Sequence, residues 1–289
     1  MSTSPGPASP IGVFDSGIGG ISVLRALRAE LPQEKFVYVA DAAHAPYGER
    51  DDAYLLARAH AITHYLIEQH AIKALVVACN TATAAAISEM RQTYPNLPIV
   101  GIEPALKPAT AVSKTGFVGV MATRGTLGSE KFGNLLQSLK GATTFVLQQC
   151  DGLADAIEHT NAIKIEALCA QYTRAMGRFG LKFGEMDVLV LGCTHYPFIT
   201  EQLKATVGEN IVHLEGGAPV ARQTRRLLNE RDMLTMEQNT SDAETGQLRL
   251  FSTGDPNALA VAVLRWLGES VGAHAIIIRD RHVSKDSRC

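Results

Sequence analysis

This sequence has few of the features that mark nucleic-acid-binding or membrane-spanning proteins. Its 27 Lys and Arg residues are balanced by 29 Asp and Glu residues, and the formal net charge of −2 offers no basic surface to a nucleic acid or an anionic membrane. No apolar run is long enough to cross a bilayer. The Ser/Pro-rich residues 1–10 lack a basic start and an apolar stretch, so we expect a loose tail there rather than a secretory signal. We therefore expect a cytoplasmic protein without a nucleic-acid or membrane partner.

Cysteine is scarce, and its spacing excludes the common metal and redox motifs. The five cysteines are odd in number, lie far apart and form no C-x-x-C pair, so neither a zinc knuckle nor a thioredoxin-type motif is present. We expect reduced thiols and no bound metal. A cysteine close to a buried strand is most often a small core residue. We assign that role to Cys150 and Cys169, and we place Cys289 in a C-terminal tail.

Strand-like and helix-like segments alternate along the chain, whose 289 residues suffice for two domains. Strands are expected at residues 11–14, 36–39, 74–78, 99–101, 117–120, 144–147, 188–191, 211–214 and 248–252. Helices are expected at residues 21–31, 52–69, 82–94, 129–139, 163–176, 220–230 and 256–267. A polar loop is expected at 235–246, and residues 273–289 receive no assignment. This alternation favours an α/β fold with parallel sheets and helices on both faces.

Two stretches share one pattern, in which an apolar run leads to a cysteine followed by small hydrogen-bonding residues. The first run leads to Cys79 and the second to Cys193. Each cysteine should lie at the C-terminal tip of a buried strand, where open α/β sheets bind ligands. Thr81 and Thr194 are expected to cap the helices that follow. The repeated pattern suggests an internal duplication, with two pseudo-symmetric lobes that place the two thiols on opposite walls of one cleft.

A glycine-rich loop follows the first expected strand. Gly17 and Gly19 fit the start of a dinucleotide-binding fingerprint, but the third glycine of that motif would fall at Ser22. An aspartate at the head of the loop, Asp15, would also repel a pyrophosphate. We expect the glycines to let the backbone approach a small ligand closely, with Asp15 and Ser16 placed to meet an amine or carry a proton.

Two thiols on opposite faces of one carbon can remove a proton from one side and return a proton to the other. This is the layout of a racemase or epimerase that needs no cofactor, and it predicts acid–base roles for Cys79 and Cys193. Small neutral donors near the two cysteines are suited to holding carboxylates, namely Ser16, Asn80, Thr81, Thr83 and Thr194.

Five motifs, in this order and spacing, resemble those of glutamate racemase, in the aspartate/glutamate racemase family. They lie at residues 13–20, 46–48, 78–82, 101–104 and 191–197. The resemblance implies a cofactor-independent isomerase that makes D-glutamate for bacterial peptidoglycan. It implies two α/β lobes, one formed by residues 1–104 plus 216–289 and the other by residues 105–215, with the active site in the cleft between them. It also implies a homodimer and regulation by a peptidoglycan precursor.

The resemblance also implies a role for individual residues. Cys79 and Cys193 would be the two acid–base residues, with Asp15 assisting Cys79, His195 assisting Cys193 and Glu158 supporting His195. Substrate contacts would come from Asp15, Ser16, Pro46, Tyr47, Gly48, Asn80, Thr81, Thr123, Thr194 and His195.

Two positions depart from the family pattern. The chain has Cys150-Asp151 where the family has Cys-Pro, and Glu215-Gly216-Gly217 where members often have Asp-Ser-Gly.

Three other functions are compatible with parts of the sequence. An aspartate or hydantoin racemase would share the two cysteines but act on another substrate. A binding protein could keep the cleft without turnover, although the presence of both cysteines argues against it. A thiol oxidoreductase is disfavoured by the absence of a C-x-x-C pair.

Overall fold

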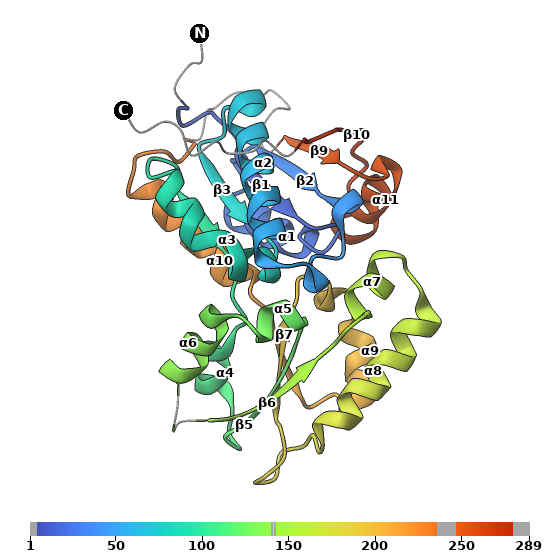
Figure 1. Cartoon of the computed structure of the whole chain (residues 1–289). Coiled ribbons are helices and arrows are strands. Elements are labelled where there is room, and N and C mark those ends of the chain that lie inside the picture. The colour runs from blue at the N-terminus through green and yellow to red at the C-terminus, as the bar shows by residue number, and fades with distance from the viewer. Residues whose placement is uncertain (1–4, 140, 142, 236–246, 280–289) are drawn as a thin grey trace.

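The computed structural model describes residues 5–139, 141, 143–235 and 247–279, and these residues form two lobes that meet along one face (Figure 1). Nearly all of the polar loop expected at 235–246 lies outside the described residues, as does Cys289. Within the described part of the chain, no helix is both long and apolar enough to cross a membrane.

The first lobe is built on a six-stranded sheet with the strand order β10-β9-β2-β1-β3-β4. All of its strand pairs are parallel. Every residue of β1, β2 and β3 is buried, which explains why these strands are near-continuous apolar runs. The strands are β1 (Ile11–Asp15), β2 (Phe36–Ala40), β3 (Ala74–Val77), β4 (Ile99–Gly101), β9 (Leu248–Ser252) and β10 (Ala273–Ala275).

The second lobe contains a four-stranded parallel sheet with the order β6-β5-β7-β8. This order repeats the order β2-β1-β3-β4 of the first sheet, so β7 takes the place of β3. Cys79 and Cys193 therefore follow topologically equivalent strands, in agreement with the duplication suggested by the sequence. The strands are β5 (Phe117–Ala122), β6 (Thr144–Gln149), β7 (Val188–Gly192) and β8 (Val212–Leu214).

Helices flank both sheets (Figure 1). Those of the first lobe are α1 (Ile21–Glu30), α2 (Asp52–His70), α3 (Asn80–Thr93), α10 (Gly217–Asn229) and α11 (Pro256–Leu267). Those of the second are α4 (Leu106–Val112), α5 (Arg124–Leu127), α6 (Glu130–Ser138), α7 (Leu153–Glu158), α8 (Ala162–Met176) and α9 (Thr200–Val207). Short 3₁₀ turns lie at η1 (Ala42–His44), η2 (Tyr47–Glu49) and η3 (Tyr196–Ile199). Helix α10 returns the chain to the first lobe, where it packs against α1.

The expected helix caps were wrong. Helix α3 begins at Asn80, two residues earlier than expected, and its N-cap is Cys79, whose sulfur accepts a hydrogen bond from the backbone N–H of Ala82 at 3.5 Å. The hydroxyl of Thr81 instead lies 2.9 Å from that of Thr123 in the other lobe. No side-chain cap is made at η3, where Thr194 precedes the N-cap residue. The early start of α3 places the thiol itself at the helix N-terminus.

Candidate active site

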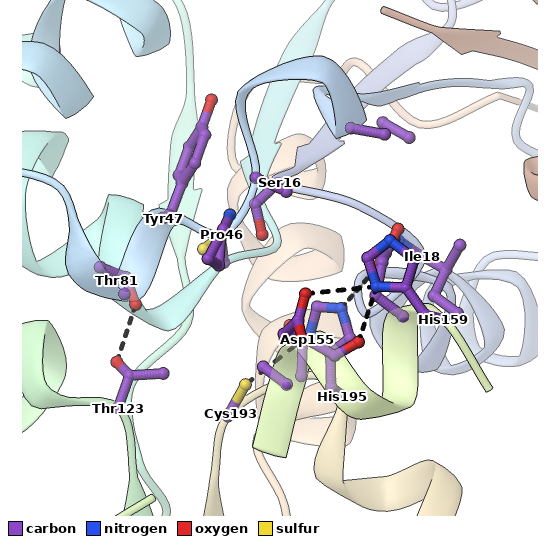
Figure 2. A pocket seen from close by; sticks show the side chains of 18 of the residues that line it. Ser16, Ile18, Pro46, Tyr47, Thr81, Thr123, Asp155, His159, Cys193 and His195 are labelled. Atoms are coloured by element: carbon purple, nitrogen blue, oxygen red, sulfur yellow. Dashed lines mark hydrogen bonds and ion pairs between the residues drawn. The ribbon is translucent and has the colours of Figure 1, made fainter. Parts of the chain in front are cut away.

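A cavity of about 390 Å³ lies between the two lobes and receives both Cys79 and Cys193. Figure 2 shows side chains of the two lobes around it, with Ser16 and Thr81 on one side and Cys193 and His195 on the other. It opens where β3 and β7 end, as expected for the carboxyl ends of parallel strands. Twelve of the residues expected at the site line it: Ser16, Pro46, Tyr47, Gly48, Cys79, Asn80, Thr81, Thr123, Glu158, Cys193, Thr194 and His195.

Cys193, His195 and Glu158 form a connected chain of polar groups. The sulfur of Cys193 lies 3.7 Å from Nδ1 of His195, and Nε2 of the same imidazole lies 2.6 Å from Oε2 of Glu158. Burial alone would lower the pKa of His195, but its contacts with Cys193 and Glu158 outweigh burial and raise this pKa well above its usual value. This rise favours the imidazolium form, in which one ring N–H faces the sulfur and the other faces the carboxylate.

The carboxylate of Glu158 also reaches across to the first lobe. Its Oε2 and Oε1 lie 3.0 and 3.2 Å from the backbone N–H of Ile18, which donates to them. Burial would raise the pKa of Glu158, but hydrogen bonding to His195, the charge of that ring and the Ile18 N–H together lower it. A single anionic group thus holds the histidine of one lobe and the glycine loop of the other.

The glycine loop is shaped by this contact with the second lobe. A β-carbon on Gly17 would lie 2.3 Å from Oε2 of Glu158, and one on Gly19 would lie 2.4 Å from Nδ1 of His195. Real β-carbons essentially never come so close to another atom, so neither position accepts a larger residue without movement of Glu158 or His195. The sequence analysis expected these glycines to admit a ligand, but the structure places the second-lobe side chains against them.

Asp15 lies behind the cavity wall, although it was expected to contact substrate. Its side chain is fully buried and is not part of the lining. Oδ2 accepts a hydrogen bond from the Gly20 N–H at 2.7 Å, and Oδ1 has no partner in the described structure. Burial raises the pKa of Asp15 to about 6, against the opposing effect of His195. Asp15 thus has no surface for direct substrate contact here, but it can exchange a proton near neutral pH.

Cys79 lies in a different electrostatic setting from Cys193. Burial raises the pKa of its thiol well above the usual value, and the nearby Asp15 carboxylate raises it further, whereas the Ala82 N–H opposes both. Cys79 is therefore protonated at neutral pH in this structure. Both Cys79 and Cys193 are free thiols.

The Tyr47 hydroxyl does not point toward Cys193 and His195. The phenol donates to Oδ2 of Asp41 at 2.5 Å, and the side chain is 1% exposed. Figure 2 shows the ring pointing away from Cys193 and His195. The ring therefore anchors the loop, while the polypeptide at Pro46 and Gly48 borders the cavity.

Several residues that line the cavity are not predicted from the sequence. Cys150 is expected in the core, and its side chain is buried, yet it also borders the cavity just after β6. Further lining residues come from α7 and the residue after it, from the end of β9, and from the loop and first turn of α11 that follow: Asp155, His159, Ser252, Gly254, Asp255, Ala258 and Leu259. The rule that ligands bind at strand ends could have identified Cys150 and Ser252, because both lie at the C-terminal ends of parallel strands.

The two departures from the family pattern have separate structural consequences. Asp151 pairs with Arg124 at 2.6 Å, which ties the loop after β6 to helix α5 at the cavity edge. Glu215 accepts a hydrogen bond from the Gly217 N–H at 2.5 Å, at the start of α10. Neither change removes a residue of the Cys193–His195–Glu158 chain.

No three His, Cys, Asp or Glu side chains in the described ranges are grouped so that they could hold a metal ion. The side chains that line the cavity carry hydroxyls, an amide, thiols, imidazoles and carboxylates, and such groups can bind a small polar molecule and transfer protons to it.

The structure is a parallel α/β fold in which two thiols, at equivalent strand ends, line one cavity between two lobes. Comparison with known proteins identifies the enzyme family that has this arrangement. The family model described as Asp/Glu/Hydantoin racemase matches residues 20–224. A glutamate racemase of Ectopseudomonas mendocina is 44% identical over 92% of this chain and 97% of its own length. The chain belongs to the Asp/Glu/Hydantoin racemase family and is an isomerase.

Solved structures agree with this assignment. A glutamate racemase isoform of Bacillus anthracis is similar with a TM-score of 0.80 and 29% identity, covering 93% of this chain and 98% of its own. The Escherichia coli glutamate racemase, solved in complex with L-glutamate and the activator UDP-MurNAc-Ala, has a TM-score of 0.75 and 26% identity, covering 93% and 99% of the two chains. The expected two-lobe α/β fold is thereby confirmed.

Proposed function

We propose that this protein racemises glutamate, interconverting the L and D enantiomers by proton transfer with Cys79 and Cys193 and without a cofactor. The observation that carries the proposal is that both thiols line one cavity, each delivered by its own lobe. The 44% identity to a curated glutamate racemase, over nearly the whole of both chains, supports glutamate as the substrate.

The two thiols have unequal starting states in this mechanism. Cys79 begins as the thiol, because burial and Asp15 hold its proton. Cys193 is assigned the part of the base because Nδ1 of His195 lies 3.7 Å from its sulfur, where the imidazole can take up and return the thiol proton. When the α-hydrogen of the substrate faces Cys193, that thiolate takes the proton and Cys79 donates one to the opposite face of the carbon. The opposite enantiomer is processed in the reverse sense once Cys79 is the thiolate and Cys193 the thiol.

In this proposal Asp15 acts through Cys79, and Glu158 acts through His195. Asp15 lies close enough to Cys79 to raise the pKa of its thiol, and its own pKa of about 6 suits it to accept and return a proton. Glu158 keeps His195 charged and oriented. The substrate carboxylates would be held by neutral donors and by the backbone of residues 46–48, with side chains from Ser16, Asn80, Thr81, Thr123 and Thr194.

The domain assignment and biological role are proposed on the same basis. A first lobe of residues 1–104 plus 216–289 agrees with the strands of the six-stranded sheet, all of which fall in those ranges, and the strands of the other sheet fall within 105–215. The product would be D-glutamate for peptidoglycan. That the protein forms a homodimer, and that a peptidoglycan precursor regulates it, are predictions.

Exchange of the α-proton in deuterated water tests this function. The wild-type protein should introduce deuterium at the α-carbon of both glutamate enantiomers and generate each from the other, with no added pyridoxal phosphate or metal. Replacing Cys79 or Cys193 by Ser should lower racemisation by about 10²- to 10⁴-fold, the range for loss of a general acid or base. Cys169→Ser is the matched control, since Cys169 is buried but outside the cavity lining. Full activity in either active-site variant would overturn the two-thiol mechanism, and turnover of aspartate or a hydantoin alone would overturn the substrate.

A further inference from the structure

The chain after β10 stays in the first lobe and packs into the hydrophobic cluster that also contains Tyr47 of the loop bordering the cavity. The Ile276 N–H donates to the Ser252 carbonyl at 2.9 Å, which extends the pairing beyond β10. Ile276 and Ile278 face the core cluster that contains Tyr47 and Leu55, whereas Ile277 is 86% exposed. No function is predicted from the sequence for this run of three isoleucines. We call residues 276–278 the C-terminal strap.

A buried ion pair connects the strap to the interior of the lobe. Arg58 of α2 is 1% exposed and Asp41, just after β2, is fully buried. The Arg58 guanidinium donates from Nε and Nη2 to the two oxygens of Asp41 at 2.9 and 2.8 Å. Its Nη1 donates to the carbonyl of Ile278 at 2.9 Å. A planar guanidinium can hold a carboxylate and a carbonyl in one fixed geometry, which a lysine cannot do.

The same carboxylate holds the loop at the cavity edge. Asp41 accepts the phenol proton of Tyr47 on Oδ2 at 2.5 Å and the hydroxyl proton of Thr253 on Oδ1 at 3.0 Å. Tyr47 lies in the cavity loop, and Thr253 lies between two lining residues, Ser252 and Gly254. Strap, helix α2 and both cavity loops therefore share one buried cluster of hydrogen bonds.

We propose that the C-terminal strap positions the substrate loop at residues 46–48, acting through Arg58, Asp41 and Tyr47. The strap supplies the carbonyl that fixes the Arg58 guanidinium, Arg58 fixes Asp41, and Asp41 fixes the Tyr47 ring. With the ring held, the backbone of Pro46 to Gly48 stays at the cavity edge. Arg58, Asp41 and Ile278 are positioning residues, since none of them lines the cavity. The proposal rests on the function proposed above only in taking residues 46–48 as substrate contacts.

A matched pair of variants in the full chain tests the strap. Ile278→Ala removes a buried strap side chain and Ile277→Ala an exposed one, so the second is the control. Weakening the strap in Ile278→Ala should raise the KM for glutamate at least fivefold and change kcat less than KM, while Ile277→Ala stays within twofold of wild type.

Amide hydrogen exchange gives a second readout that does not depend on turnover. The backbone of residues 43–50 should exchange at least tenfold faster in Ile278→Ala than in Ile277→Ala, with the β1 and β3 amides unchanged. If Ile278→Ala does not fold, the smaller change Ile278→Val decides the question. A folded Ile278→Ala protein with wild-type KM and wild-type exchange in residues 43–50 would overturn the proposal. If the wild-type protein racemises neither enantiomer, the proposed function fails, and the exchange comparison still decides whether the strap holds the loop.

Discussion

At the scale of single residues, the two lobes prepare their thiols by opposite electrostatic means. Cys79 is surrounded by apolar packing and an aspartate, which favour the neutral thiol. Cys193 lies beside an imidazolium that Glu158 keeps charged. The proposed mechanism needs one thiol that donates a proton and one that accepts it, and the two thiols differ in their polar neighbours in keeping with these roles.

Glu158→Gln should lower the pKa of His195 and so disfavour its charged form. Burial alone lowers the pKa of this histidine, and the carboxylate is one of the two groups that reverse the effect. With the charge removed, the pKa of His195 should fall, and the ring should lose its proton at a lower pH than in the wild type. NMR titration of the His195 ring measures this directly. Glu166→Gln on the exposed face of α8 is the control and should leave the titration unchanged. An unaltered His195 pKa in Glu158→Gln would contradict the assigned role.

Asp15→Asn should stabilise the protein at neutral pH and impair catalysis. The folded-state pKa of about 6 lies above the ordinary value of 3.8, so the folded state binds the proton more tightly than the unfolded state. The contribution of Asp15 to wild-type stability should therefore fall as the pH rises from about 4 to above 6. The neutral amide avoids this loss, which amounts to about 3 kcal/mol in the variant's favour between pH 4 and pH 8. Denaturant unfolding at the two pH values checks the sign; a difference that is the same at both would contradict it.

At the scale of elements, the glycine loop between β1 and α1 carries the contacts between the lobes. The Ile18 N–H donates to Glu158, and the Ser22 hydroxyl donates to the backbone carbonyl of Thr194 at 2.9 Å. The missing side chains at Gly17 and Gly19 leave the space that Glu158 and His195 fill. The loop therefore sets the position of the second-lobe proton chain, in addition to bordering the cavity.

Gly19→Ala should lower kcat by about 10²-fold with little effect on overall folding. The added methyl group would displace His195, whose Nδ1 would otherwise lie 2.4 Å from it, and misplacement of a catalytic group by about 1 Å costs on this order. Gly133→Ala on α6 is the matched control, because its β-carbon would meet nothing within 4 Å. That variant should keep wild-type kcat and gain about 0.5–1 kcal/mol of stability from the better helix former. Steady-state kinetics with both variants checks the pair, and equal kcat values would contradict the steric argument.

At the scale of the whole molecule, the site exists only where two separately built lobes meet. Besides the glycine loop, the lobes touch through the hydroxyls of Thr81 and Thr123 and through a stack of Phe198 on Trp266. The stacked rings lie 4.4 Å apart between centroids with 16° between their planes. Movement of one lobe relative to the other must therefore alter the surroundings of the indole.

Fluorescence of Trp266 should report lobe movement on ligand binding. The sequence has a single tryptophan, so the emission has one source. Addition of glutamate should change the emission with saturation, because closure around the ligand alters the stack with Phe198. Phe198→Leu should reduce the change by at least half, while Phe183→Leu, at a 90% exposed phenylalanine, should leave it intact. An equal change in emission in both variants would mean that the stack of Phe198 on Trp266 does not report lobe movement.

The sequence by itself determined the parallel α/β architecture and placed both cysteines and their polar neighbours at strand ends. Parallel strands buried on both faces must be continuous apolar runs, so β1 to β3, and the cysteine after β3, could be located from local pattern alone. The cavity lining at Cys79, Asn80, Thr194 and His195 followed from strand ends. Short elements such as β10 and α5 escaped prediction, since too few residues carry a periodic signal.

Only the tertiary structure decided which groups are partners across the two lobes. The contact of Glu158 with Ile18 joins residues 140 positions apart, and the link from Arg58 to Ile278 spans 220. Burial and hydrogen bonding at such long-range contacts set the protonation of Asp15, Cys79 and His195, and they turn the Tyr47 hydroxyl away from the cavity. Local sequence fixes which side chains are present at each strand end, but pKa and orientation depend on neighbours that only the packed chain brings together.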